Sequence, residues 1–176
     1  MAIAALGILL TDGVVESQPG GGQEARRSVA EYDVKAAFLL NFAKFVEWPH
    51  SDEARARTPF SICILGDDPF GGALDQVIQG ETIEDRSLVV KRISKLREGC
   101  EVLFISSSER DIPSILKQAG PRVLTVGEGS DFLRKGGMIS FLIEDRRVRF
   151  DVNLGAADRA SLRISSRLLG VARTVL

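Results

Sequence analysis

The sequence contains short apolar runs, each four to six residues long, separated by helical or turn-forming stretches. These runs are Phe60 to Leu65 (FSICIL), Glu101 to Ser106 (EVLFIS) and Val123 to Val126 (VLTV). Runs of this length, rich in β-branched residues and without polar alternation, predict strands that are buried on both faces. Such strands need helices on both sides of their sheet, so these runs constrain the chain to an α/β fold.

The segment from Glu31 to Val46 predicts the first helix of the folded domain. Apolar side chains recur in it at spacings of four, four and three residues, the pattern of an amphipathic helix: Val34, Phe38, Phe42 and Phe45. The helix should end at Trp48, because the residue before a proline avoids helical geometry.

The remaining elements complete a mainly parallel, twisted sheet with helices on both faces and an antiparallel hairpin at one edge. In chain order we first predict a helix from Pro69 to about Ile78 capped by Asp68, a strand over Leu88 to Ile93, and a helix within Ser107 to Ala119 capped by Ser108 or Asp111. A helical turn over Ser130 to Arg134 follows, and then strands over Gly137 to Ile143 and Val148 to Val152, which are joined by a turn over Glu144 to Arg147. The last element is a closing helix over Ala156 to Leu176, whose first half could instead be extended.

The length of 176 residues suits one domain, which we place at residues 29–176. Residues 1–28 are expected to combine a partial signal-peptide-like leader with a disordered segment. The apolar run Ala2 to Leu10 is too short to span a bilayer as a helix, and no positively charged segment precedes it. The stretch from Asp12 to Ser28 is polar and rich in glycine.

Composition and charge exclude several classes of function. The formal net charge is -1 and the charges are interspersed, which argues against a nucleic-acid partner. The chain has a single histidine, His50, and two cysteines, so a structural zinc site lacks ligands, and we expect neither a metal nor a cofactor. The two cysteines fit either one disulfide in an exported protein or two buried thiols.

No catalytic motif passes a chemical test, so we expect a protein that is not an enzyme. The turn from Gly66 to Gly72 (GDDPFGG) fits neither a P-loop nor a dinucleotide fingerprint, and its two aspartates would repel a phosphate. The serines from Ser106 to Ser108 lack the GxSxG pattern, and His50 lies in a distant loop. An enzyme would require Asp67, Glu109 and Glu128 to converge on one cleft.

Two surfaces remain as candidate binding sites. The carboxyl ends of parallel strands bind ligands in open α/β sheets, which makes one set of residues candidates for a small-ligand crevice: Gly66, Asp67, Phe70, Ser106 and Gly127. The aromatic stripe of the first helix is a candidate protein interface wherever it is exposed: Phe38, Phe42, Phe45 and Trp48.

An ordered set of segments resembles the YfiR-like family of bacterial periplasmic proteins. The segments are LLNFAKFVEWP (Leu39 to Pro49), FSICILGDDPFG (Phe60 to Gly71), GCEVLFISSSE (Gly99 to Glu109), LTVGE (Leu124 to Glu128), GGMISF (Gly136 to Phe141) and VRFDVNLGAADRASLRISSRLLGVA (Val148 to Ala172). The resemblance runs from about Glu31 to the C-terminus, and it rests on the order of the segments, since none is diagnostic alone.

The resemblance implies a periplasmic regulator, with no catalysis of its own, that binds and represses the periplasmic sensor part of an inner-membrane diguanylate cyclase or kinase. It also implies a homodimer that does not itself span the membrane, and a disulfide between Cys63 and Cys100. Family members carry a second cysteine pair that is missing here, which weakens any redox switching that depends on it. Further partner-binding candidates lie near the C-terminus: Asn153, Arg159 and Leu168. A small-ligand-binding periplasmic module is the alternative.

Overall fold

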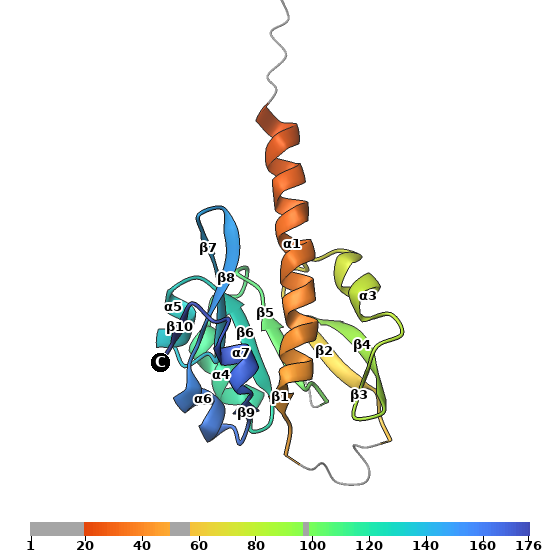
Figure 1. The fold of residues 1–176 in the computed structure, drawn as a ribbon, viewed down its shortest axis with the longest axis vertical. Coiled ribbons are helices and arrows are strands. Elements are labelled where there is room, and N and C mark those ends of the chain that lie inside the picture. Colours follow the sequence, from red (N-terminus) through yellow and green to blue (C-terminus); the bar gives the residue numbers. More distant parts are fainter. Residues whose placement is uncertain (1–19, 50–56, 97–98) are drawn as a thin grey trace, which may run out of the picture.

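The computed structural model of the protein describes residues 20–49, 57–96 and 99–176, with side chains from Arg26 onward. The predicted leader over residues 1–19 and His50 lie outside the described residues. The main feature of the described part is an eight-stranded sheet (Figure 1). Its strands follow the spatial order β10 (Thr174–Val175), β8 (Arg147–Val152), β7 (Ile139–Glu144), β6 (Leu124–Glu128), β5 (Val102–Ile105), β2 (Phe60–Leu65), β4 (Arg86–Ile93) and β3 (Thr82–Ile83).

The five central strands are parallel, and their order defines a doubly wound fold. Counted along the chain, β2, β4, β5, β6 and β7 take the spatial order 2-1-3-4-5, which is that of flavodoxin-like domains. The hairpins β7–β8 and β3–β4 are antiparallel, and β10 adds a parallel strand outside β8. The predicted mainly parallel α/β fold with an antiparallel hairpin is therefore confirmed, although β10, not the hairpin, forms that edge.

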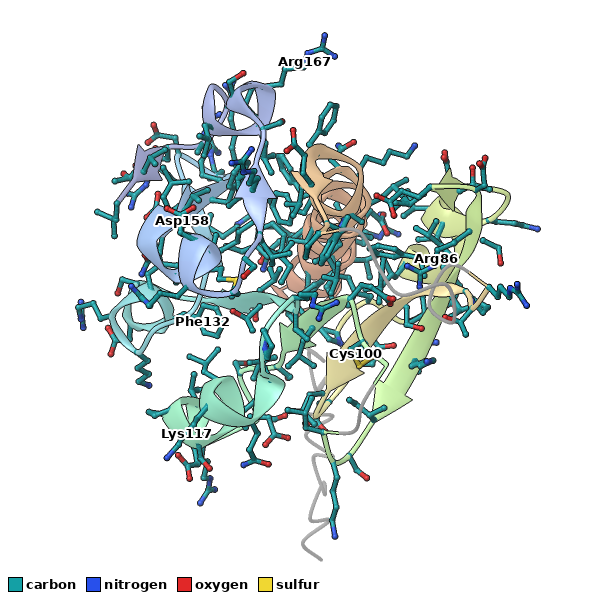
Figure 2. The ribbon with its side chains drawn as sticks, turned by 90° about the horizontal axis from the view of Figure 1, so that it is seen from below. Arg86, Cys100, Lys117, Phe132, Asp158 and Arg167 are labelled. Atoms are coloured by element: carbon teal, nitrogen blue, oxygen red, sulfur yellow. A yellow bond between two sulfur atoms is a disulfide. The ribbon has the colours of Figure 1, made fainter. Side chains whose placement is uncertain are left out.

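Helices cover both faces of the sheet. The helices α1 (Gly20–Phe45) and α3 (Ala73–Ile78) pack on one face, and α4 (Ile112–Ala119) and α5 (Asp131–Arg134) on the other. Figure 2 separates these layers, with α1 seen end-on above the sheet and α4, which carries Lys117, below it. The helices α6 (Leu154–Arg159) and α7 (Ser166–Leu169) and a small sheet of β1 (Val46–Glu47) with β9 (Arg163–Ile164) complete the α1 face.

The first helix differs from its prediction in the residue at which it begins and in which of its side chains face the core. It begins at Gly20, within the segment expected to be disordered, and its first turns extend beyond the sheet (Figure 1). Good helix formers such as Gln23 to Arg27 supply propensity there, but no apolar stripe marks the segment. Val34 is 45% exposed, whereas the neighbouring Lys35 is only 4% exposed, so the buried face is rotated away from the predicted stripe.

The helix predicted from Pro69 begins later, at Ala73. The Asp68 carboxylate accepts a hydrogen bond from the Phe70 backbone N–H at 2.8 Å, which stabilises a turn in place of a first helical turn. The second carboxylate oxygen of Asp68 accepts from Arg92 at 2.7 Å. Of the two candidate caps for α4, Asp111 makes the capping bond, accepting from the Ser114 N–H at 3.2 Å.

The closing helix predicted over Ala156 to Leu176 is wrong. The Asn153 side chain caps α6 by accepting from the Ala156 N–H, and the left-handed backbone of Ser161 (φ 61°) lies just beyond its end. Ser165 then caps the short α7, and the chain finishes as β10 beside β8. Capping serines and asparagines favour helix starts, so they divide this segment into several short elements.

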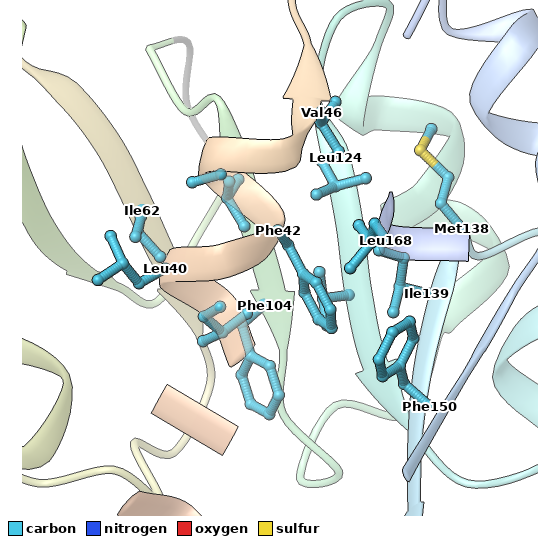
Figure 3. Packing of buried hydrophobic residues seen from close by; sticks show 14 of the residues in the cluster. Leu40, Phe42, Val46, Ile62, Phe104, Leu124, Met138, Ile139, Phe150 and Leu168 are labelled. Carbon is cyan, nitrogen blue, oxygen red and sulfur yellow. The ribbon is translucent and has the colours of Figure 1, made fainter. Parts of the chain in front are cut away.

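The disulfide joins adjacent strands on the α4 face. Cys63 on β2 and Cys100 just before β5 are bonded, with 5.8 Å between their Cα atoms, as the family resemblance implied. Alternate side chains of β2 point to opposite faces, which places Cys63 in a small cluster and Ile62 in a larger one. Figure 3 shows the larger cluster, in which the Phe42 ring extends from α1 toward Phe150.

Candidate interaction surfaces

The predicted small-ligand crevice lies where β2 and β5 end, at the topological switch point of the sheet. Gly66 has a left-handed backbone (φ 87°), and a Cβ built on it would lie 2.7 Å from the Ser108 hydroxyl. The Asp67 N–H donates to that same hydroxyl at 3.1 Å. The loops after β2 and β5 are therefore in direct contact at the switch point.

The other crevice candidates are also packed by protein atoms. Phe70 is 4% exposed and meets Phe104 edge to face at 4.8 Å between ring centroids. Ser106 is buried, and a Cβ on Gly127 would lie 2.5 Å from the Phe132 ring. Phe70, Ser106 and Gly127 thus lie in packed interior, whereas Gly66 is half-buried and Asp67 is exposed.

Helix α1 covers this edge with a polar network that the sequence analysis missed. The Lys35 ammonium forms ion pairs with Glu31 and with Glu128 at the end of β6. The Tyr32 hydroxyl donates to Glu128 at 3.2 Å, and the Tyr32 ring packs against Phe70 at 5.5 Å between centroids. Lys35 also lies 4.3 Å from the Tyr32 ring centroid. Helix α1 is thus joined to β6 by an ion pair and a hydrogen bond to Glu128, and to the loop after β2 by a ring contact.

This network raises the pKa of both Tyr32 and Lys35. Burial, together with the nearby Glu128 carboxylate, raises the pKa of Tyr32 above its ordinary 10.0. Burial alone would lower the pKa of Lys35, but its hydrogen bonds to Glu128 and Glu31 reverse this, and the pKa is raised. Glu128, one of three carboxylates that an enzyme would have required, is thus engaged in holding α1.

The aromatic candidates of the first helix divide into core and surface. Phe42 is fully buried, stacks on Phe141 and meets Phe150 edge to face, so it contacts no partner in this conformation. Phe38, Phe45 and Trp48 are half-buried and pack at the margin of the same cluster.

The C-terminal candidates divide in the same way. Leu168 is 3% exposed and belongs to the core, which removes it as a direct contact. Asn153 is half-buried, and its side chain is used to cap α6. Arg159, at the end of α6, is exposed and remains available for a partner.

A groove at the opposite, amino-terminal edge of the sheet was not predicted. It has a volume of about 560 Å³ and lies between the end of α1, β1 and β3. Its lining comprises Ala43, Lys44, Val46, Glu47, Trp48, Thr82, Ile83 and Glu84. Only Trp48 among these residues was a candidate, since the short β3 has no apolar run to mark it.

A buried ion pair lies next to the disulfide. Arg86 donates to Glu101 at 2.5 Å and to the backbone carbonyls of Thr58 and Pro59. The other Glu101 oxygen accepts from the Ser61 N–H at 2.8 Å. In the described part of the chain no fully buried side-chain nitrogen or oxygen lacks a hydrogen-bond partner, so this pair fixes the segments beside Cys100.

The fold defines the chain as a doubly wound α/β domain whose loops after β2 and β5 contact each other at the switch point. The chain belongs to the YfiR/HmsC-like family, whose sequence model matches residues 32–173. This is a regulatory, non-catalytic family. The disulfide fits an oxidising compartment.

Comparison with solved structures supports the fold. A crystal structure of a conserved domain protein from Vibrio cholerae superposes with a TM-score of 0.54 and 11% sequence identity. The match covers 82% of this chain and 60% of that one, so this chain spans less than two thirds of the other protein's length. At this identity the likeness concerns the fold alone. No curated protein matches the sequence.

Among the described residues, no helix is both long enough and apolar enough to cross a membrane.

Proposed function

We propose that this protein is a periplasmic regulator that binds and represses the periplasmic sensor part of an inner-membrane diguanylate cyclase or kinase. The observation that carries the proposal is the family match over residues 32–173, which spans nearly the whole described domain. Direct contact between the loops after β2 and β5 favours a protein partner over a small ligand, because the Asp67 N–H bonds to the Ser108 hydroxyl at the switch point. In this proposal the protein acts as a homodimer and performs no catalysis.

Repression would arise from differential binding. A regulator that binds the inactive state of its partner more tightly than the active state shifts the population toward the inactive state. In this protein the partner-binding candidates that are half-buried or exposed would provide the contacts: Phe38, Phe45, Trp48, Asn153 and Arg159. The core positions Phe42 and Leu168 would act by supporting these contacts.

The test uses inner membranes from the source cell and the purified oxidised protein. Adding the protein should lower the cyclic di-GMP made by the membranes, and a tagged form should retain one membrane signalling protein. The Arg159→Glu variant should repress less well, whereas Arg134→Glu, on α5 at the other face, should repress normally. Unchanged cyclic di-GMP and no retained signalling protein, under both oxidising and reducing conditions, would refute the proposal.

A further inference from the structure

The groove at the amino-terminal edge of the sheet combines a strand edge with an apolar wall. The Glu81 carbonyl accepts from the Leu88 N–H, so the alternation of an antiparallel ladder turns the backbone groups of the next residue, Thr82, away from β4. In the described part of the chain, β3 pairs with β4 alone, so Thr82 presents its N–H and carbonyl at an open edge.

The facing wall of the groove is apolar and ends in an aromatic ring. Ala43 and Val46, at the end of α1 and in β1, line it together with Trp48. The Trp48 indole N–H donates to the Ala43 carbonyl at 3.2 Å, and its ring meets Phe60 at 5.2 Å, which holds the ring in place. This wall suits a side chain that an added strand would direct into the groove.

The free charges on the groove are acidic. Its one cation, Lys44, forms an ion pair with Glu81 at 2.7 Å. Within the described residues neither Glu47 nor Glu84 forms an ion pair, although Glu47 lies opposite Arg163 in the β1–β9 ladder. A segment that enters the groove is therefore favoured if it carries basic side chains.

We infer that this groove binds an extended polypeptide segment that alternates basic and apolar residues and adds a strand to the edge of β3. The backbone of the segment would bond to Thr82, its apolar side chains would contact Val46 and Trp48, and its basic side chains would face Glu84. The inference gives a chemistry to one partner contact of the proposed function, but peptide binding can be tested without any cyclase. Absence of peptide binding would leave the result of the repression assay unaffected, and absence of repression would leave the result of the peptide-binding test unaffected.

Trp48 is the only tryptophan in the chain, so its fluorescence reports directly on the groove. The probe is a blocked hexapeptide of alternating lysine and valine, compared with an alternating glutamate and valine peptide and with a lysine peptide that contains prolines. We expect a saturable fluorescence change with the lysine–valine peptide, and much weaker changes with the other two. Added salt should weaken the binding.

Two variants test the contacts, and the second hairpin of the fold provides a matched control. Glu84→Lys should weaken binding of the lysine–valine peptide about fivefold, as expected for reversal of one surface charge. Glu84 and Asp145 hold the same first turn position in hairpins β3–β4 and β7–β8, with φ of 50° and 49°, so Asp145→Lys should leave binding unchanged. Thr82→Pro, which removes an outward N–H from an edge strand, should weaken binding about tenfold.

Several outcomes would overturn the inference. Equal binding of the lysine and glutamate peptides would remove the charge argument, and equal binding of the proline-containing peptide would remove the added strand. A fluorescence change that follows protein concentration without peptide would assign the groove to a second copy of the chain. If Thr82→Pro fails to fold, the Glu84→Lys and Asp145→Lys pair still decides the question, because equal affinities would contradict the inference.

Discussion

The two faces of the central sheet are stabilised in different ways. On the α1 face, 28 buried residues form one apolar cluster, with Phe42, Phe141 and Phe150 in mutual contact. On the α4 face the cluster has nine buried residues, and two of them are the disulfide cysteines. The larger face gains its stability from the area it buries, while the smaller face adds a covalent link between neighbouring strands.

The difference also concerns polar groups. The α1 face includes a buried lysine that joins the helix to the end of β6, whereas Arg86 and Glu101 form their pair beside the disulfide, near the starts of β4 and β5. The first pair connects α1 to the end of β6, and the second connects β4 to the segments that precede β2 and β5. We therefore expect the α1 face to respond most to loss of packing, and the α4 face to respond most to reduction.

Phe42→Ala should give the largest effect, since it removes the ring at the centre of the larger cluster. Truncating a fully buried phenylalanine should lower the free energy of unfolding by about 5 kcal/mol. Urea unfolding followed by circular dichroism measures this. Phe45→Ala, one turn along the helix at a half-buried position, is the matched control and should cost clearly less. Equal costs would mean that the aromatic cluster is not the centre of stability on this face.

Loss of the disulfide should have the next largest effect. The bond closes a loop with a sequence separation of 37 residues, and the chain-entropy estimate for such a loop is about 4 kcal/mol. The Cys63→Ala/Cys100→Ala double variant should lose this stability, and reductant should then have no further effect. If reductant leaves the unfolding of the wild-type protein unchanged, the contrast between the two faces is wrong.

Lys35→Met tests the link between α1 and β6. It leaves the Glu128 carboxylate, whose side chain is 17% exposed, with only the Tyr32 hydroxyl as a partner. The loss should be about 2 kcal/mol, below that of a fully buried pair because water still reaches Glu128. Lys44→Met on the same helix breaks the exposed pair with Glu81 and should cost well under about 1 kcal/mol. Adding Glu128→Gln to Lys35→Met should recover part of the loss.

The sequence predicts the parts of this fold in which burial dominates. The strands β2, β5 and β6 are buried along almost their whole length, so continuous apolar runs mark them clearly. The β7–β8 hairpin is marked by the charged turn between its strands. The two-residue β3 and the short C-terminal elements carry no such pattern, because tertiary pairing and capping hydrogen bonds form them.

The candidate surfaces were harder to predict, because they depend on contacts between distant segments. Glu31 and Lys35 are one helical turn apart, a visible signal for an ion pair, but the apolar stripe through Val34 does not include Lys35. The groove requires β1 and β3 to meet, and these strands are formed by residues 46–47 and 82–83. Trp48 was a partner-binding candidate because of its aromatic side chain, whereas no sequence pattern predicts the edge strand β3 opposite it.

Alkaline pH should cause the smallest loss in the free energy of unfolding, because Tyr32 is only partly buried. This loss should arise on the α1 face, so it sharpens the contrast between the two faces of the sheet. The pKa of Tyr32 and that of Lys35 are both raised in the folded protein, so the stability they contribute is fully present below about pH 10 and is lost as the pH rises through the folded values. Tyr32 is the only tyrosine, so tyrosinate absorbance measures its titration directly. The midpoint should lie above 10.0 in the native protein and return to that value in urea. Tyr32→Phe should weaken the alkaline loss of stability, whereas a native midpoint at or below 10.0 would contradict the proposed role of the network in holding α1.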